Sequence, residues 1–461
     1  MTLETRSEQG FDIATLENGL SVLGESQPQA RSVALGYFVR TGARDEGPLE
    51  GGLSHFLEHM AFKGNEKMDA LELNRRFDAL GASVNAFTGE EVTAYHAATL
   101  PEHAPELLEL LTGLLRPALR LDDFELEKAV ILEEIEMYDD MPESRLFDLL
   151  RPQFYGGHPL GNSVLGSRSS VAALTPEAML EYHTRRYSPN NLVLAFVGKY
   201  DWEALLEQVR ALTAGWSPQT VGRSYPDFVP RSSVTLHPDP NLSRALLGMM
   251  FPGFKATDPR RLASSVLAEI LGGENGRLHW ALLDTRLADE ASFSHQDGDG
   301  LGHFEGFLSC DFERVAQCLE IYDGVLEQIV REGVSEAELR RAKNKLAVST
   351  ALRDDTPYPR LFALGLEYLY SGKLVSTEEM VRQVRAVTQG EVNSVLEEKP
   401  FAVRALTGLG RVEALEGWGQ SLTALQEAVQ EGLEDVKAGR VVPFDDNFVE
   451  NIKRMGNQRK D

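Results

Sequence analysis

The chain has 461 residues, of which 42% are hydrophobic and 25% charged, as in a soluble globular protein with more than one domain. Its 71 acidic residues outnumber the 46 basic ones and give a net charge of −25. This balance argues against nucleic acid and anionic membranes as partners, because phosphate contacts need clustered lysine and arginine.

The sequence contains only two cysteines, Cys310 and Cys318, so a disulfide framework is excluded. Residues 1–11 are polar and lack the apolar core of a signal peptide. No apolar run reaches the ~20 residues of a membrane helix. We therefore expect a soluble, cytoplasmic protein.

The first half of the chain is expected to mix strands and helices. Strands are expected at 20–23, 33–39, 83–88, 92–99 and 191–197, which are rich in β-forming residues. Helices are expected at 53–63, 70–80, 105–115, 122–138 and 202–214, where apolar residues recur at helical spacing. Thr175, Pro176 and Glu177 have the composition of a helix start. We expect residues 151–170 to be irregular.

The second half is expected to repeat this order after a proline-containing linker at 215–231. It offers strands at 246–251, 306–311 and 401–406, helices at 262–271 and 315–330, and a capped helix that starts at Ser335. The expected fold class is α+β, with two structurally similar domains, each a mainly antiparallel sheet covered by helices. We expect these domains at 1–214 and 232–420, followed by an acidic helix and tail at 421–461.

Residues 51–64 read Gly-Gly-Leu-Ser-His-Phe-Leu-Glu-His-Met-Ala-Phe-Lys-Gly. On a helix, His55 and His59 lie on one face and can bind one metal ion, with Glu58 beside it. H-x-x-E-H is a zinc signature. A five-residue pattern with three fixed positions can also arise by chance on an ordinary surface helix.

A catalytic zinc site usually has three protein ligands and a water molecule, so a third ligand is needed. The helix at 122–138 offers Glu125, Glu127, Glu133, Glu134 and Glu136. Glu127 and Glu134 are two turns apart and share a face, whereas Glu133 points about 100° away from Glu134. Residue chemistry alone leaves the choice open.

Segment 51–64 resembles the signature of the pitrilysin/insulinase family of zinc peptidases, and in particular its short-chain branch with the mitochondrial processing peptidase subunits and bacterial relatives. Segments 82–88, 127–135 and 187–198 also resemble family segments. The resemblance extends over most of residues 10–420. It implies one Zn²⁺ per chain, held by His55, His59 and Glu134.

The resemblance also implies further roles at the site. Glu58 becomes the general base and Glu127 a supporting catalytic carboxylate. Asn85 and Ala86 would bind an extended peptide substrate as an added strand. Glu133 remains an alternative to Glu134 as the third ligand. We interpret His96 and His158 as structural residues.

The chain departs from the family pattern in its second half. Active relatives carry an Arg and a Tyr seven residues apart that hold the substrate, but the matching positions here are Leu283 and Glu290. A shifted match offers Arg286 and Phe293, which lacks a phenol. We therefore expect a homodimer that encloses a chamber, or a heterodimer with a related subunit that supplies the pair.

Together these features predict a zinc-dependent endopeptidase that acts on unfolded peptides or short proteins. The alternative is a non-catalytic or structural subunit of a family hetero-oligomer. The missing Arg/Tyr pair favours this alternative, and the four intact residues His55, Glu58, His59 and Glu134 argue against it.

Overall fold

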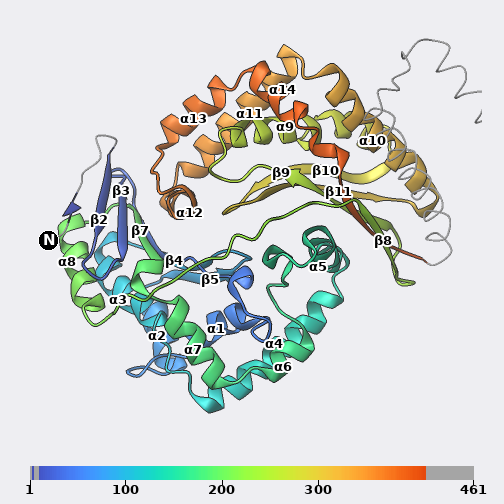
Figure 1. Cartoon of the computed structure of the whole chain (residues 1–461). Coiled ribbons are helices and arrows are strands. Elements are labelled where there is room, and N and C mark those ends of the chain that lie inside the picture. Colours follow the sequence, from blue (N-terminus) through green and yellow to red (C-terminus); the bar gives the residue numbers. More distant parts are fainter. Residues whose placement is uncertain (1–2, 5–9, 412–461) are drawn as a thin grey trace, which may run out of the picture.

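The computed structural model describes residues 3–4 and 10–411, which form two separate sheets (Figure 1). The first sheet has the strand order β1-β2-β3-β7-β4-β6-β5 and the second β10-β11-β9-β12-β8. The first contains β1 (Leu3–Glu4), β2 (Phe11–Thr15), β3 (Ser21–Ser26), β4 (Val33–Val39), β5 (Ser83–Thr88), β6 (Thr93–Thr99) and β7 (Leu192–Gly198). The second contains β8 (Ser233–Pro238), β9 (Ala245–Gly253), β10 (Ala288–Asp297), β11 (Gly302–Cys310) and β12 (Ala405–Gly410). The predicted α+β class is confirmed.

The two sheets have the same internal topology. The orders β3-β7-β4-β6-β5 and β8-β12-β9-β11-β10 list strands that follow one another equivalently along the chain. β3 with β7 and β8 with β12 are parallel, and the other neighbours in these orders are antiparallel. The predicted repeat is therefore confirmed, with β1 and β2 added to the first sheet.

Helices pack on both sheets. Those of the first half are α1 (Leu53–Ala61), α2 (Ala70–Ala79), α3 (Ala104–Leu114), α4 (Leu121–Asp139), α5 (Pro142–Tyr155), α6 (Arg168–Ala173), α7 (Pro176–Arg186) and α8 (Trp202–Thr213). Those of the second half are α9 (Arg261–Gly272), α10 (Val315–Glu332), α11 (Glu336–Asp354), α12 (Pro357–Ser371), α13 (Thr377–Ala386) and α14 (Gln389–Glu397). Single turns lie at 43–45, 101–103, 159–161, 189–191, 279–283, 312–314 and 400–402. Within the described residues, none of these helices has the length and apolar character needed to span a bilayer.

One helix from each half packs on the sheet of the other half. α5 packs on β9 and β12 of the second sheet, where Leu146 and Leu150 are fully buried. α12 packs on β4 and β7 of the first sheet, and a side chain at Gly365 would collide with the Phe38 ring. Because α5 and α12 occupy equivalent places in the repeat, each half contributes a helix to the other half's core. The domain boundaries at 214 and 232 stay a prediction.

Some predicted elements are wrong. Residues 151–170 were expected to be irregular, but α5 extends to Tyr155 and α6 begins at Arg168. The face of α5 that carries Leu146, Leu150 and Phe154 has helical spacing, which Pro152 and the following glycines obscure. β12 begins at Ala405 rather than 401 because Pro400–Ala402 forms a single turn. The sequence predictions also omitted β1, β2, β8, β10 and α12–α14, although Thr388 and Glu391 at the start of α14 have the spacing of a capping box. The expected acidic helix and tail at 421–461 lie outside the described residues.

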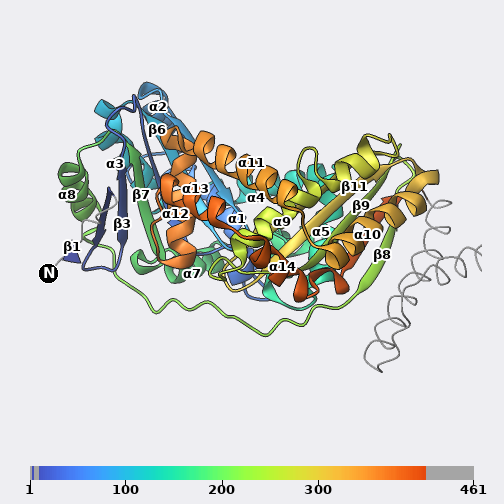
Figure 2. The ribbon, with the colours of Figure 1, turned by 90° about the horizontal axis from the view of Figure 1, so that it is seen from above.

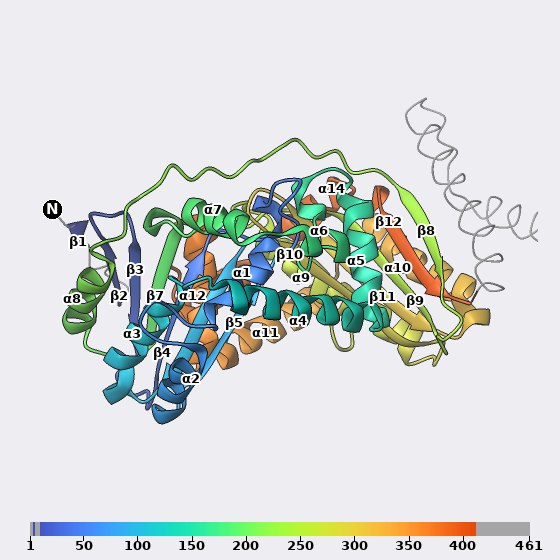
Figure 3. The same ribbon diagram turned by 90° about the horizontal axis from the view of Figure 1, so that it is seen from below.

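Residues 216–232 contain no helix or strand and run as an extended chain from α8 to β8. Figures 2 and 3 show this segment along one side of the molecule. It therefore passes both halves, and some of its side chains contact both.

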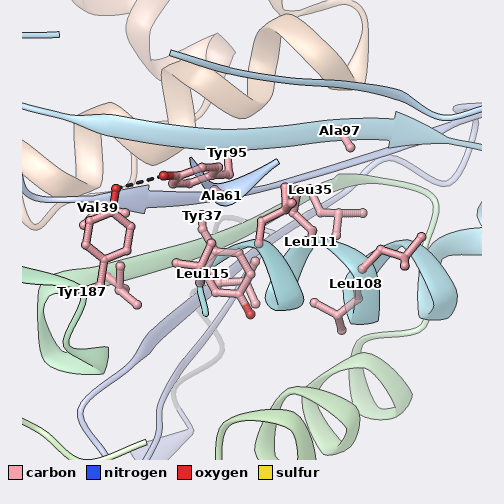
Figure 4. Close-up of a cluster of buried hydrophobic side chains, with 14 of the residues drawn as sticks. Leu35, Tyr37, Val39, Ala61, Tyr95, Ala97, Leu108, Leu111, Leu115 and Tyr187 are labelled. Atoms are coloured by element: carbon pink, nitrogen blue, oxygen red, sulfur yellow. Dashed lines mark hydrogen bonds between the residues drawn. The ribbon is translucent and has the colours of Figure 1, made fainter. Parts of the chain in front are cut away.

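The core of the first half fixes the position of α1. Tyr37 of β4 and Tyr95 of β6 are fully buried, and the hydroxyl groups of Tyr95 and Tyr187 lie 2.9 Å apart (Figure 4). On α1, Phe56 is fully buried and stacks on Phe124 of α4, with ring centroids 4.5 Å apart. This contact sets α1 beside α4, the two helices that carry the predicted metal ligands.

The predicted capped helix at Ser335 is confirmed as α11. Ser335 and Glu338 form a reciprocal capping box, and Arg277 Nε donates to Glu338 Oε1 at 2.7 Å. Burial alone would raise the pKa of Glu338, but the hydrogen bonds from Arg277 and Ser335 lower it to about 2.

Glu338→Gln is therefore expected to lower the free energy of unfolding by roughly 1 kcal/mol at pH 7, since the group is partly exposed and solvent screens the interaction. The ionised form stabilises the fold above the ordinary carboxyl pKa, and this contribution is lost as pH falls through the folded value. Denaturant unfolding of both proteins between pH 7 and pH 2 should show the difference shrinking. A difference that stays constant with pH would contradict the electrostatic origin.

Candidate metal centre

The side chains of His55, His59 and Glu134 converge between α1 and α4. The two histidine Nε2 atoms are 3.2 Å apart, and Glu134 Oε2 lies 3.5 Å from His59 Nε2 and 3.8 Å from His55 Nε2. Tetrahedral zinc with bonds of about 2.0–2.1 Å holds its ligand atoms ~3.3 Å apart. Two imidazoles and one carboxylate at these separations fit a zinc ion. Among the described residues, no other group of three or more His, Cys, Asp or Glu side chains comes together in this way.

The backbone around Gly52 starts α1 at the right place. Gly52 has φ 89°, and a Cβ at this position would contact the Leu165 backbone carbonyl, so this turn favours glycine. The carboxylate of Glu46 accepts the backbone N–H groups of Gly52 at 2.9 Å and Ser54 at 2.7 Å. Glu46 thereby satisfies N–H groups at the helix start that have no partner within the helix.

Glu127 holds the ring of His59 from the side away from the metal group. His59 Nδ1 lies 2.9 Å from Glu127 Oε1, and Lys63 forms an ion pair with the same carboxylate. Burial alone would raise the pKa of Glu127, but the hydrogen bonds from His59 and Lys63 lower it. An ionised Glu127 that accepts a hydrogen bond from His59 Nδ1–H leaves the Nε2 lone pair free for a metal.

The two histidines differ in their protonation. Burial and the neighbouring His59 lower the pKa of His55 to about 3, which keeps His55 in the neutral form that binds metal. Burial alone would lower the pKa of His59, but its hydrogen bond to Glu127 and the carboxylate of Glu134 raise it. Metal binding therefore has to displace a proton from His59 at acidic pH. His55 Nδ1 is buried and has no hydrogen-bond partner within the described residues.

Glu58 lies next to the metal group and contacts the first sheet. Thr88, the last residue of β5, donates a hydrogen bond from its hydroxyl group to Glu58 Oε2 at 2.7 Å. Burial raises the pKa of Glu58, while the Thr88 hydrogen bond and the charge of His59 act in the opposite direction. The sequence predictions did not include Thr88, although its position at the end of a predicted strand could have pointed to it.

β5 is the edge strand of the first sheet and pairs only with β6 among the described strands. Asn85 and Ala86 lie in the middle of β5, opposite His96 and Tyr95. Ala86 N–H donates to Asn85 Oδ1 at 2.9 Å. These two residues therefore lie on an unpaired strand edge whose end contacts Glu58.

The remaining candidate residues lie outside the metal group. Glu133 is exposed on α4. His96 is 4% exposed, with Nδ1 2.8 Å from the Tyr358 hydroxyl, and His158 Nδ1 accepts the Leu160 N–H at 3.1 Å. Both histidines thus have internal hydrogen-bond partners.

No Arg/Tyr pair of the expected kind lies in the matching region of the second half. Leu283 is in the turn at 279–283, and Glu290 is exposed on β10. The shifted pair, Arg286 and Phe293, cannot hold a substrate, because Phe293 is 5% exposed and packs against Phe251 in the core of the second half.

Comparison with known proteins agrees with this geometry. The sequence profile described as insulinase (peptidase family M16) matches residues 21–168, and the profile described as peptidase M16 inactive domain matches residues 173–346. A Mycobacterium tuberculosis protein named as an uncharacterized zinc protease is 35% identical over 392 residues, 83% of this chain and 89% of that protein. The chain belongs to the insulinase family of peptidases, M16. It is a zinc metalloprotease of this family, as the predicted resemblance implied.

Other relatives cover a similar share of the chain. The Bacillus subtilis protein named uncharacterized zinc protease YmxG is 30% identical over 387 residues, 83% of this chain and 93% of that protein. A crystal structure of a Helicobacter pylori protease has a TM-score of 0.79 at 20% identity and covers 87% of this chain and 99% of its own. A Pseudomonas fluorescens structure named as a peptidase M16 inactive domain has a TM-score of 0.80 at 20% identity. At this identity the two structures support the fold alone.

Proposed function

We propose that the chain is an endopeptidase that hydrolyses unfolded peptides or short proteins with one zinc ion per chain. The observation that carries the proposal is the convergence of His55, His59 and Glu134 beside Glu58, at the end of an unpaired edge strand. His55, His59 and Glu134 would hold the zinc. Bound zinc lowers the pKa of its water molecule to about 7 and polarises the peptide carbonyl.

The protein's own residues then handle the proton and the substrate. Glu58 takes a proton from the attacking water and delivers it to the leaving amine. Thr88 fixes the orientation of the Glu58 carboxylate. Glu127 acts indirectly, because it accepts a hydrogen bond from His59 Nδ1–H and so keeps Nε2 directed at the metal.

The substrate would bind as an added strand along β5. A strand edge offers backbone hydrogen bonds that do not depend on the substrate's side chains, which suits varied unfolded sequences. Asn85 and Ala86 would contact the peptide, and binding would replace the hydrogen bond between Ala86 N–H and Asn85 Oδ1. Such an edge accepts only an extended segment, which a folded protein rarely offers.

Glu127→Gln is expected to weaken zinc binding by about 10–100-fold, the usual effect of losing an outer hydrogen-bond partner of a histidine ligand. The substitution should also free Lys63 from its ion pair. Zinc affinity measured by competition with a chromophoric chelator checks this, with the exposed Glu125→Gln on the same helix as the control. Equal zinc affinity in the two variants would show that Glu127 does not support the metal site.

A second candidate function is a non-catalytic subunit, because the second half lacks the Arg/Tyr pair that active relatives carry. We propose that the active form is a homodimer, or a heterodimer with a related subunit that supplies such a pair. Native mass spectrometry with metal analysis separates the two functions. A preparation with less than about half a zinc per chain, made without chelators, would favour the structural role.

The proposed function itself is tested with the purified chain and a long unstructured peptide that carries a fluorophore and a quencher. We expect zinc-dependent cleavage at internal bonds. Products that differ from the substrate only by single terminal residues would contradict an endopeptidase.

A further inference from the structure

A buried cluster of alternating charges lies where the first half, the linker and the second half meet. Asp45 and Arg44 follow β4, Glu91 lies in the β5–β6 turn, Arg223 is in the linker and Asp299 is in the β10–β11 turn. The side chains of Arg44, Asp45 and Arg223 are at most 3% exposed, and those of Glu91 and Asp299 are 9% exposed. None of these residues has a role in the proposed reaction.

Arg223 joins the three parts of the chain. Its guanidinium forms ion pairs with Asp45 at 2.6 Å and with Asp299 at 2.8 Å, and it donates to the Glu91 backbone carbonyl at 2.6 Å. Burial alone would raise the pKa of Asp299, but Arg40 and Arg223 lower it, so the carboxylate is ionised at neutral pH. The second half therefore contributes a fixed charge to a cluster on the first half.

One branch of the cluster leads to the general base. Glu91 forms an ion pair with Arg44 and accepts the Asp299 backbone N–H at 2.9 Å. The same turn is tied to the loop after β4, because Gly89 and Glu90 carbonyls accept the backbone N–H groups of Ala43 at 3.2 Å and Arg44 at 2.9 Å. This turn follows directly on Thr88, which holds Glu58.

A second branch leads to the start of α1. Arg186 pairs with Asp45 at 2.8 Å and donates to Thr41 Oγ1 at 3.0 Å. Thr41 Oγ1 is 2.8 Å from the Tyr182 hydroxyl, which is 2.6 Å from Ser54 Oγ on α1. Ser54 precedes the ligand His55. The side chains of the second branch are buried, whereas Thr88, Gly89 and Glu90 on the first branch are partly exposed. The positions of α1 and of the end of β5 therefore depend on one set of contacts.

Such a cluster is a poor way to stabilise a fold, because removing charges from water costs about as much as their attraction returns. Its effect is geometric, since breaking one contact leaves the other groups unpaired and forces them to move. Catalytic groups respond strongly to small displacements, and a shift of about 1 Å can cost 10²-fold in rate.

We propose that Asp299 and Arg223 are positioning residues for the active site, so that the second half and the linker hold Thr88 and Glu58 in the orientation needed for proton transfer. This inference rests on the proposed peptidase function. It gives the second half, whose described residues include no metal group, a defined part in the reaction within the same chain.

The test compares Asp299→Asn with Asp323→Asn in zinc-loaded full-length protein. Asp323 forms a bidentate pair with Arg404, both 17% exposed, away from the cluster. We expect Asp299→Asn to lower kcat about 10–100-fold with KM changed less than about threefold and zinc content unchanged, and Asp323→Asn to leave kcat within about twofold. If Asp299→Asn does not fold, Arg223→Lys answers the same question, because lysine keeps the charge but cannot make all three contacts.

A second readout does not depend on activity. Amide hydrogen exchange measured by mass spectrometry should become at least about tenfold faster in residues 83–93 of Asp299→Asn, and stay unchanged there in Asp323→Asn. An inactive wild-type protein would contradict the proposed function, and the exchange result would still test the cluster. Equal kcat in the two variants, or unchanged exchange at 83–93, would overturn the positioning role.

Discussion

Glu58→Gln should lower the rate of peptide cleavage by about 10²–10⁴-fold, the usual contribution of a general base. The glutamine keeps the size of the side chain and can still accept the hydrogen bond from the Thr88 hydroxyl group, but it cannot take a proton from water. Because Glu58 is not a proposed ligand, the variant should retain its zinc. Single-turnover cleavage of the quenched peptide at saturating enzyme measures this rate directly.

The control for this prediction is Glu125→Gln, which neutralises an exposed carboxylate on α4. It should cleave at the wild-type rate. A Glu58→Gln protein that binds zinc normally and retains more than about a tenth of the activity would show that another group takes the proton.

Glu134→Gln should cost the protein most of its zinc. Glu134 Oε2 lies 3.5 Å from His59 Nε2 and is the only proposed anionic ligand. Removing an outer hydrogen-bond partner already weakens zinc binding by about 10–100-fold, so loss of a charged ligand should exceed this. We expect the variant to lose zinc on dialysis and to lose zinc-dependent cleavage with it.

Glu133→Gln provides a matched control one residue away on the same helix. Glu133 is exposed and lies outside the metal group, so this variant should keep zinc and activity. The reverse result, with zinc lost from Glu133→Gln and kept by Glu134→Gln, would make Glu133 the third ligand in place of Glu134.

The local part of the site could be predicted from the sequence, because helical spacing alone puts His55, Glu58 and His59 together. For the third ligand, periodicity narrowed the choice to the face of Glu127 and Glu134 but could not separate them. The structure separates them by position. Glu134 approaches Nε2 of both histidines, whereas Glu127 approaches Nδ1 of His59.

The contacts between distant segments were beyond prediction from the sequence. Local patterns predicted most elements of the first half, but not that α5 would pack on the second sheet and α12 on the first. Their apolar faces show that each helix is buried, without showing which sheet buries it. For the same reason the ion pairs of Arg223 could not be predicted, since its partners Asp45 and Asp299 lie far away along the chain.

The central claim is that this chain cleaves peptides with zinc held by His55, His59 and Glu134. The most direct measurement is the cleavage rate of an unstructured peptide by the purified protein as isolated, after chelation, and after addition of one equivalent of zinc. We expect activity in the first sample, loss in the second and full recovery in the third. Activity that survives complete removal of the metal would contradict the account.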